Sequence, residues 1–275
     1  FKYHHATFGG WNAKEIMGYK NLDELQTKIE RCSFRALKAE CLDLPAKVYE
    51  TRTVELAGAQ AKAYRDMRNH LIASVEGETL TAAGILAQMT RLSQIAGGFL
   101  DDQEIAGNAK IADLRELLGD LFSEHPERKV IVWCRFIAEI KAIHALCESL
   151  PIPSAMFYGE TPAEARQRII DSFQAEADPL RVFIGQSRTG GMGITLTAAD
   201  AVVYFSNDWS PEVRLQSEDR AHRIGQTRSV TYFDLVAADT IDEQIIAALK
   251  AKKSLADIVT GDKARLLALL KDSNE

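Results

Sequence analysis

From residue 108 to residue 250 the sequence alternates continuous apolar runs with segments of helical periodicity. A continuous apolar run is typical of a parallel strand that is covered by helices on both faces. Alternation of such strands with helices indicates an open parallel sheet with right-handed crossovers. We therefore predict an α/β fold whose strands lie at 130–134, 154–158, 181–185, 201–205 and 229–236.

Helix-start signals stand between these runs. Asn108 is placed to cap a helix with apolar residues at helical spacing. Residues 161–164 and 240–243 each read Thr-x-x-Glu, the pattern of a capping box. Pro211 is suited to the first position of a helix. Helices are therefore expected after Asn108, at 137–150, after each capping box, after Pro211 and, as a last short one, at 264–270.

Residues 1–107 follow a different pattern. The first 20 residues mix aromatic residues, His and Gly without a clear period, and a helical pattern follows. Residues 48–56 alternate as a strand, and residues 58–100 fit two helices of an α-hairpin joined by a polar turn. We predict a mainly helical linker or protrusion over residues 1–107, with one strand at 48–56, followed by a second domain over residues 108–275.

Composition narrows the classes of function. The net charge of −6 excludes a chain that binds nucleic acid by bulk positive charge, so any DNA contact must be a local patch. No apolar run approaches the roughly 20 residues that a membrane helix needs. The four cysteines form no CxxC pair and, with His4 and His5, fit no common zinc spacing. We therefore expect the cysteines to be reduced thiols in the core and expect no zinc site. The protein is expected to be intracellular, in the cytoplasm or at the nucleoid or nucleus. Phe1 in place of Met indicates that the chain is a fragment.

Two loops carry most of the chemistry. The strand at 181–185 ends in a loop with Gly190, Gly191 and Gly193, whose backbone is able to approach a ligand closely. The strand at 201–205 ends in a polar loop that contains Trp209, which we expect to be exposed.

The helix that Pro211 opens has a polar face. Gln216, Arg220 and Arg223 stand at offsets of zero, four and seven, which would place an amide and two guanidiniums on one side. Apolar residues are too sparse there for an ordinary core-facing stripe. The polar face is therefore interpreted as a ligand-binding face.

The run SEDRAHRIGQTRSV, with GGMGITLTAAD upstream and WSP between them, resembles motifs V and VI of the SNF2-type ATPases in helicase superfamily 2. The resemblance implies a RecA-like C-terminal lobe, which works with an N-terminal RecA-like lobe, ATP and Mg²⁺ on double-stranded DNA. This chain has Gln186-Ser187-Arg188-Thr189 where the family usually reads Ser-Thr-Lys-Ala, which keeps a hydroxyl and a cation. The residues implied are Arg220 and Arg223 as catalytic arginine fingers, Gly191, Gly193 and Gln216 at the nucleotide, and Ser187, Arg188 and Trp209 at the DNA.

Each of these assignments has a structural alternative. Arg223 is also spaced to form a surface ion pair with Asp219 at i,i+4, which would contribute only a few tenths of a kcal/mol. Trp209 is equally a candidate for a hydrophobic plug against a neighbouring helix. Ser187 and Arg188 are alternatively loop residues with no partner.

A complete ATPase site also needs a phosphate-binding loop with a Lys and a carboxylate that holds Mg²⁺. The sequence contains no GxxxxGK[ST], and no Asp-Glu pair follows a buried strand. We therefore predict the C-terminal lobe of an ATP-dependent double-stranded DNA translocase or remodeller, inactive as an ATPase without its N-terminal lobe. The alternative is a non-catalytic RecA-like module that binds nucleic acid or protein.

Overall fold

The computed structural model describes residues 6–9, 15–33, 42–77, 81–188, 193–252, 267 and 270. The chain divides into two compact units, residues 1–43 and residues 44–275. In the first unit, strands β1 (Ala6–Gly9) and β2 (Glu15–Tyr19) form an antiparallel pair, and helix α2 (Leu22–Glu30) follows them. Sequence periodicity did not predict this strand pair.

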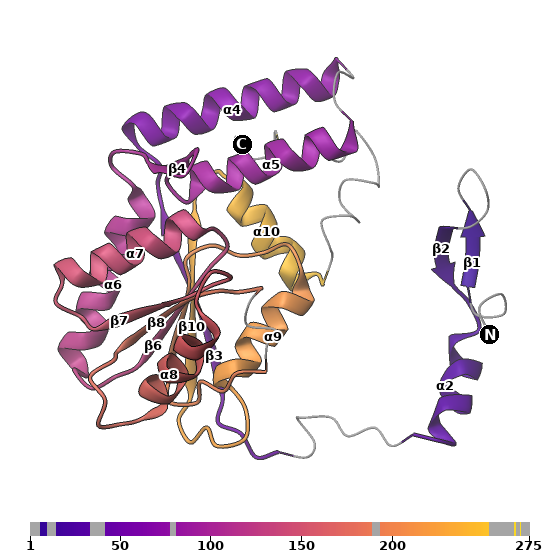
Figure 1. Ribbon diagram of the computed structural model, residues 1–275. Coiled ribbons are helices and arrows are strands. Elements are labelled where there is room, and N and C mark those ends of the chain that lie inside the picture. Colours follow the sequence, from indigo (N-terminus) through magenta and orange to yellow (C-terminus); the bar gives the residue numbers. More distant parts are fainter. Residues whose placement is uncertain are drawn as a thin grey trace. The chain divides into compact units, whose positions relative to one another are not determined.

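The second unit is built on a six-stranded sheet in which every neighbouring pair is parallel (Figure 1). The strand order is β3-β10-β9-β6-β8-β7. The strands are β3 (Lys47–Val54), β6 (Val130–Cys134), β7 (Ser154–Phe157), β8 (Val182–Gln186), β9 (Ala201–Tyr204) and β10 (Val230–Ala237). The predicted open parallel sheet flanked by helices, of the RecA-like type, is confirmed.

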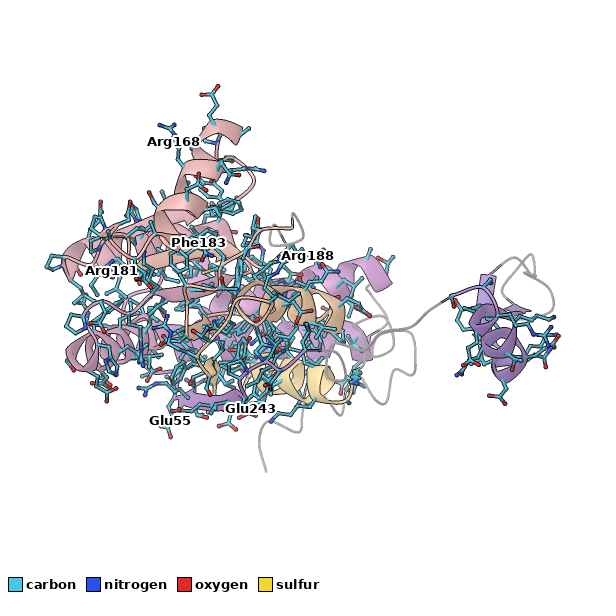
Figure 2. All side chains as sticks on the ribbon, turned by 90° about the horizontal axis from the view of Figure 1, so that it is seen from below. Glu55, Arg168, Arg181, Phe183, Arg188 and Glu243 are labelled. Carbon is cyan, nitrogen blue, oxygen red and sulfur yellow. The ribbon has the colours of Figure 1, made fainter. Side chains whose placement is uncertain are left out.

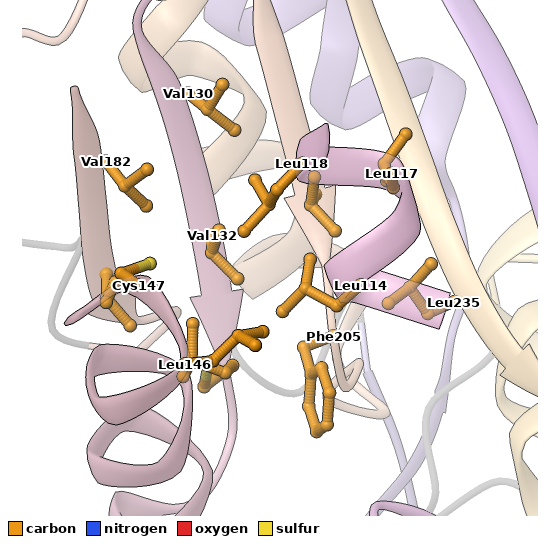
Figure 3. Packing of buried hydrophobic residues seen from close by; sticks show 14 of the residues in the cluster. Leu114, Leu117, Leu118, Val130, Val132, Leu146, Cys147, Val182, Phe205 and Leu235 are labelled. Carbon is orange, nitrogen blue, oxygen red and sulfur yellow. The ribbon is translucent and has the colours of Figure 1, made fainter. Parts of the chain in front are cut away.

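Helices cover both faces of this sheet. Leucines of α6 (Ala109–Glu124) and α7 (Ile137–Ser149) pack on alternate residues of the central strands, as Figure 3 shows for Leu118 and Leu146 beside Val132. The opposite face packs against α8 (Ala163–Gln174) and α9 (Pro211–Ala221), through Phe173 and Ala221 among others. Because the central strands are buried on both faces, they read in the sequence as continuous apolar runs.

A third core joins the helical hairpin to the sheet unit. Helices α4 (Gly58–Glu76) and α5 (Ala82–Ala96) lie side by side and pack with α10 (Ile241–Lys250) (Figure 1). The backbone N–H of Ile241, the first residue of α10, donates to the Tyr64 hydroxyl at 2.7 Å. Strands β4 (Phe99–Leu100) and β5 (Gln103–Glu104) form a short antiparallel pair after α5.

The strand expected at 48–56 has a different role from the one predicted. The sequence places this strand in the mainly helical region before residue 108, outside the predicted sheet. Instead β3 pairs with β10 along all eight of its residues and forms one edge of the sheet. The boundary between residues 107 and 108 stays a prediction.

Three of the four helix-start signals act at the residue expected. Asn108 accepts from Ile111 N and Ser210 caps the helix that Pro211 opens; Thr240 caps α10 but accepts from Asp242 N, not from Glu243 N as the predicted capping box requires. The capping box at 161–164 is wrong. Thr161 instead accepts from Tyr158 N at 3.0 Å, because its hydroxyl closes the turn between β7 and α8.

Cys134 and Cys147 are buried free thiols, as predicted. Burial raises the pKa of Cys147 to about 11. Cys32 is exposed, so its assignment as a core thiol is wrong, and Cys41 lies outside the described residues. None of the described helices is long and apolar enough to cross a membrane.

Candidate functional site at the end of helix α9

Helix α9 begins where β9 ends and returns toward the start of the neighbouring strand β10. Pro211 is its first residue, and the Ser210 hydroxyl accepts from Val213 N at 3.3 Å. The helix ends at Ala221, one residue before His222. Gln216 and Arg220 therefore share a helical face, but Arg223 does not belong to it. The seven-residue offset failed because the chain leaves the helix at His222, ahead of a turn in which Gly225 has a φ of +100°.

The turn after α9 is hydrogen-bonded to the loop that precedes β9. The side-chain amide of Gln226 donates to the carbonyl oxygens of Thr197, Ala199 and Ala221 at 2.8–3.2 Å. The backbone N–H of Leu196 donates to Arg220 O at 2.9 Å. The end of α9 and the part of the glycine loop described after residue 192 thus form one hydrogen-bonded unit.

Arg220 and Arg223 come together in this unit. Arg223 Nη1 donates to Thr195 Oγ1 at 3.0 Å. Arg220 Nε is buried and has no hydrogen-bond partner among the residues that the structure describes. Burial lowers the pKa of Arg220, and the positive charge of Arg223 lowers it further. A buried guanidinium N–H without an acceptor, next to a second cation, is an arrangement that an anion would stabilise.

The residues expected at the nucleotide are only partly placed. Gly193 lies in the same loop as Thr195 with a φ of +70°, and a Cβ there would meet nothing within 4 Å, so backbone conformation is what favours glycine. Gln216 is exposed on α9, one turn before Arg220. Gly191 lies outside the described residues.

Ser187 and Arg188 form a second cluster at the carboxyl edge of the sheet. They directly follow β8, and Ser187 N donates to Cys134 O at 3.1 Å. Ser187 is only 4% exposed, and within the described ranges of the chain its hydroxyl has no hydrogen-bond partner. The side chain of Arg188, labelled in Figure 2, is 67% exposed.

Arg188 is paired with Asp208, so the alternative of a partnerless loop residue does not apply to it. Its Nε and Nη2 atoms donate to the two carboxylate oxygens at 2.7 and 3.2 Å. Burial by itself would raise the pKa of Asp208, but the hydrogen bond and charge of Arg188 outweigh it and lower the pKa. Because Asp208 precedes α9, this pair links the loop after β8 to the loop after β9.

The expectation that Trp209 is exposed is wrong. Its side chain is 3% exposed and belongs to the core formed by α4, α5 and α10, together with residues such as Tyr64, Met89 and Ile245. The hydrophobic-plug alternative therefore describes Trp209. A side chain buried to this extent offers no surface on which DNA could stack.

Sequence reasoning missed the buried charges that hold α9 in place. Arg214 stacks 3.6 Å from the centre of the Tyr204 ring and donates to Asp234 of β10 and to Asn207. Its Nε also donates to Glu218 at 2.8 Å. The i,i+4 spacing of Arg214 and Glu218 was a visible signal, whereas Asp234 lies too far along the chain for any spacing rule.

The donor set suits a phosphate more than a metal. Two guanidiniums and a threonine hydroxyl meet at the end of α9, and guanidinium N–H groups match phosphate oxygens. No group of three or more His, Cys, Asp or Glu within the described part of the chain is placed to hold a metal ion. No described residue is therefore assigned to Mg²⁺.

Comparison with known proteins gives the class of this lobe. Residues 109–225 match the family model of the helicase conserved C-terminal domain. The chain is 35% identical over 160 residues to the chromatin-remodeling ATPase INO80 of Cryptococcus neoformans var. neoformans serotype D (strain B-3501A), a match that covers 58% of this chain and 9% of that protein. It is 33% identical over 162 residues to the mouse SWI/SNF-related matrix-associated actin-dependent regulator of chromatin subfamily A member 1, covering 58% of this chain and 15% of that protein.

Solved structures of SWI2/SNF2 ATPases are also similar to this chain. The Sulfolobus solfataricus SWI2/SNF2 ATPase core domain aligns with a TM-score of 0.68 and 25% identity over 91% of this chain and 54% of that one. The same core in complex with dsDNA gives a TM-score of 0.64 and 25% identity, over 90% and 55% of the two chains. This chain is thus similar to SNF2-type ATPases, in the part of those proteins that holds the helicase C-terminal domain, and it spans only a small part of the length of the curated relatives it matches.

Proposed function

We propose that this chain is the C-terminal lobe of an ATP-dependent translocase or remodeller of double-stranded DNA. In this proposal Arg220 and Arg223 act as arginine fingers. The observation that carries it is the unpartnered, buried Nε of Arg220 beside Arg223, at the end of a helix fixed to the glycine loop. The guanidiniums of Arg220 and Arg223 lie close together, and no carboxylate of the described residues accepts from Arg220 Nε. An anionic ligand would stabilise this arrangement.

The role of the two arginines is electrostatic. Bound ATP with Mg²⁺ would supply the phosphoryl group that is transferred to water. Charge develops on that group in the transition state, and a guanidinium already aimed at it stabilises the transition state more than the ground state. The hydrogen bond from Arg223 to Thr195 orients one of the two guanidinium groups before the nucleotide binds.

Ser187 and Arg188 are proposed to contact the DNA backbone. Arg188 is exposed, and its Nε and Nη2 atoms donate to Asp208, which holds one side of the guanidinium. The Ser187 hydroxyl lacks a hydrogen-bond partner in the described part of the chain. A hydroxyl and a guanidinium of this kind suit phosphate oxygens, so affinity is expected to be salt-sensitive and independent of base sequence.

The remaining parts are assigned to an N-terminal RecA-like lobe of the same protein. That lobe would provide the phosphate-binding loop and the Mg²⁺ carboxylate, neither of which occurs in this sequence. Gly191, Gly193 and Gln216 would line the nucleotide from this side. We propose an intracellular location, in the cytoplasm or at the nucleoid or nucleus, where DNA and ATP are present.

ATP hydrolysis tests this function directly. We expect no turnover above background from the 275-residue chain alone, with or without duplex DNA. A protein that carries this chain after an N-terminal RecA-like lobe is expected to hydrolyse ATP and to do so faster when duplex DNA is added. DNA-stimulated turnover by the isolated chain would contradict the proposal, and a two-lobed protein without turnover would favour a non-catalytic binding module.

A further inference from the structure

Residues 45–49, which are the two residues before β3 and the first three residues of that strand, contact α9 and its end on both sides of Arg220. Lys47 Nζ and the Tyr49 hydroxyl each donate to Glu218 Oε2 at 2.8 Å. On the other side, His222 Nε2 lies 2.7 Å from Pro45 O. Because a carbonyl oxygen only accepts, Nε2 must carry the proton and donate. Residues 45–49, the lead-in segment, thus hold positions 218 and 222, which bracket Arg220.

Glu218 is the centre of this arrangement. Its side chain is 7% exposed, against 20% for Lys47, and it also accepts from Arg214 Nε at 2.8 Å. Burial alone would raise the pKa of Glu218, but the hydrogen bonds from Lys47 and Arg214 outweigh burial and lower the pKa. The carboxylate is therefore held in its charged form, which accepts short and directional hydrogen bonds from its donors.

These contacts are not needed to attach β3 to the sheet. Pairing along β10 already fixes the strand over residues 47–54. On the other side of β3, Arg52 donates to both carboxylate oxygens of Asp113 of α6 at 2.7–3.2 Å. The strand thus has one ion pair to α6, remote from the arginines, and one ion pair to α9, two residues before Arg220.

We propose that Lys47 and Tyr49 are positioning residues that set the orientation of Arg220 and Arg223 through Glu218, with Pro45 acting on His222 in the same way. The inference rests on the proposed function of the two arginines. The lead-in segment directly follows the boundary between the two compact units at residues 43 and 44.

The variants separate positioning from strand attachment. Tyr49→Phe removes the hydroxyl but keeps the ring that stacks on Tyr232 at 5.3 Å. Combined with Lys47→Met, it removes two of the three side-chain donors that the described residues give to the Glu218 carboxylate, and Arg214 stays. Arg52→Gln is the matched control, because it removes the ion pair of the same strand to α6. Lys47→Arg restores a cation and serves as the rescue variant.

The first measurement needs no catalysis. In the 275-residue chain labelled with ¹⁵N-arginine, the Nε–Hε resonances of Arg220 and Arg223 are expected to shift in the Tyr49→Phe/Lys47→Met variant. They are expected to stay at their wild-type positions in Arg52→Gln and close to them in Lys47→Arg. Unchanged Arg220 and Arg223 resonances in the double variant, or equal shifts in the control, would overturn the proposal.

The second measurement uses the protein that carries both lobes. For DNA-stimulated ATP hydrolysis, the double variant should lower kcat about tenfold with KM for ATP within about twofold, since orientation acts in the transition state. Arg52→Gln should keep kcat within about twofold of wild type. Equal losses in both variants would mean that β3 merely supports the fold. If the wild-type protein shows no turnover, the proposed function fails, while the resonance shifts still decide the positioning.

Discussion

Arg223 Nη1 donates a hydrogen bond of 3.0 Å to Thr195 Oγ1, across 28 residues of sequence. This bond joins the turn after α9 to the glycine loop before β9. It also limits the rotation of the Arg223 side chain, whose loss of conformational freedom would otherwise accompany ligand binding.

Thr195→Val removes this acceptor and keeps the shape of the side chain. In the protein with both lobes we expect about a fivefold loss of DNA-stimulated turnover, because Arg223 must then be ordered during the reaction. Thr195→Ser keeps the hydroxyl and should remain within about twofold of wild type. A valine variant as active as the serine variant would show that the bond does not orient Arg223.

The DNA assignment of Arg188 is tested by salt dependence. A phosphate contact contributes close to one unit to the slope of log affinity against log salt, so Arg188→Ala should reduce that slope by about one. Arg168→Ala is the control, because Arg168 is also exposed but lies on α8 (Figure 2). An Arg188→Ala slope equal to that of Arg168→Ala would remove Arg188 from the interface.

Gly185 is predicted to be intolerant of a side chain. A Cβ at this position of β8 would lie 2.7 Å from a ring carbon of Trp133 and 2.9 Å from one of Phe183. Gly185→Ala should lower the free energy of unfolding by about 1–3 kcal/mol, measured by urea denaturation. Gly119, exposed in α6 with open space at its Cβ, is the matched control, where Ala should stabilise by about 0.5–1 kcal/mol. A neutral Gly185→Ala would contradict the tight packing described for β8.

Stability is predicted to depend on pH through Glu139, at the start of α7. Burial raises the pKa of Glu139 from 4.5 to about 7, although its carboxylate accepts from Ser206 Oγ and from Phe136 N. Between these pH values the folded state binds more protons than the unfolded state, so the free energy of unfolding falls as pH rises.

Glu139→Gln has no carboxyl to ionise and should lack this fall. Relative to wild type, the variant should gain on the order of 2–3 kcal/mol between about pH 4.5 and pH 8, whatever its offset at low pH. Urea unfolding at a series of pH values measures the difference. Parallel pH profiles for the two proteins would show that Glu139 does not titrate in this range.

Much of the sheet could be predicted, because burial on both faces leaves an apolar signature. Val130 to Cys134 read as a covered strand and are one. The exposed edge strand β3 gave a weaker signal, and its partner β10 lies about 180 residues further on in the chain, so its pairing had no local signature. The RecA-like assignment of the lobe came from the motifs and not from periodicity.

The site was predicted less completely. The motifs located Arg220 and Arg223, but helical spacing placed them on one face, and the helix ends before Arg223. Trp209 was expected to be exposed because its sequence neighbours are polar, while the residues that bury it come from α4, α5 and α10. Contacts such as Lys47 to Glu218 depend on tertiary structure and leave no trace in local sequence.

The catalytic role of Arg223 is the central claim, and one substitution tests it. In the protein that carries both lobes, Arg223→Ala should lower DNA-stimulated ATP hydrolysis by roughly 10³- to 10⁵-fold, or about 4–7 kcal/mol of transition-state stabilisation, far more than a surface ion pair contributes. The unfolding midpoint and DNA affinity should stay near wild type, and Arg223→Lys should restore little, since a point charge does not reproduce the planar fork. Retention of more than about a tenth of wild-type turnover in Arg223→Ala would contradict the assignment of Arg223 as an arginine finger.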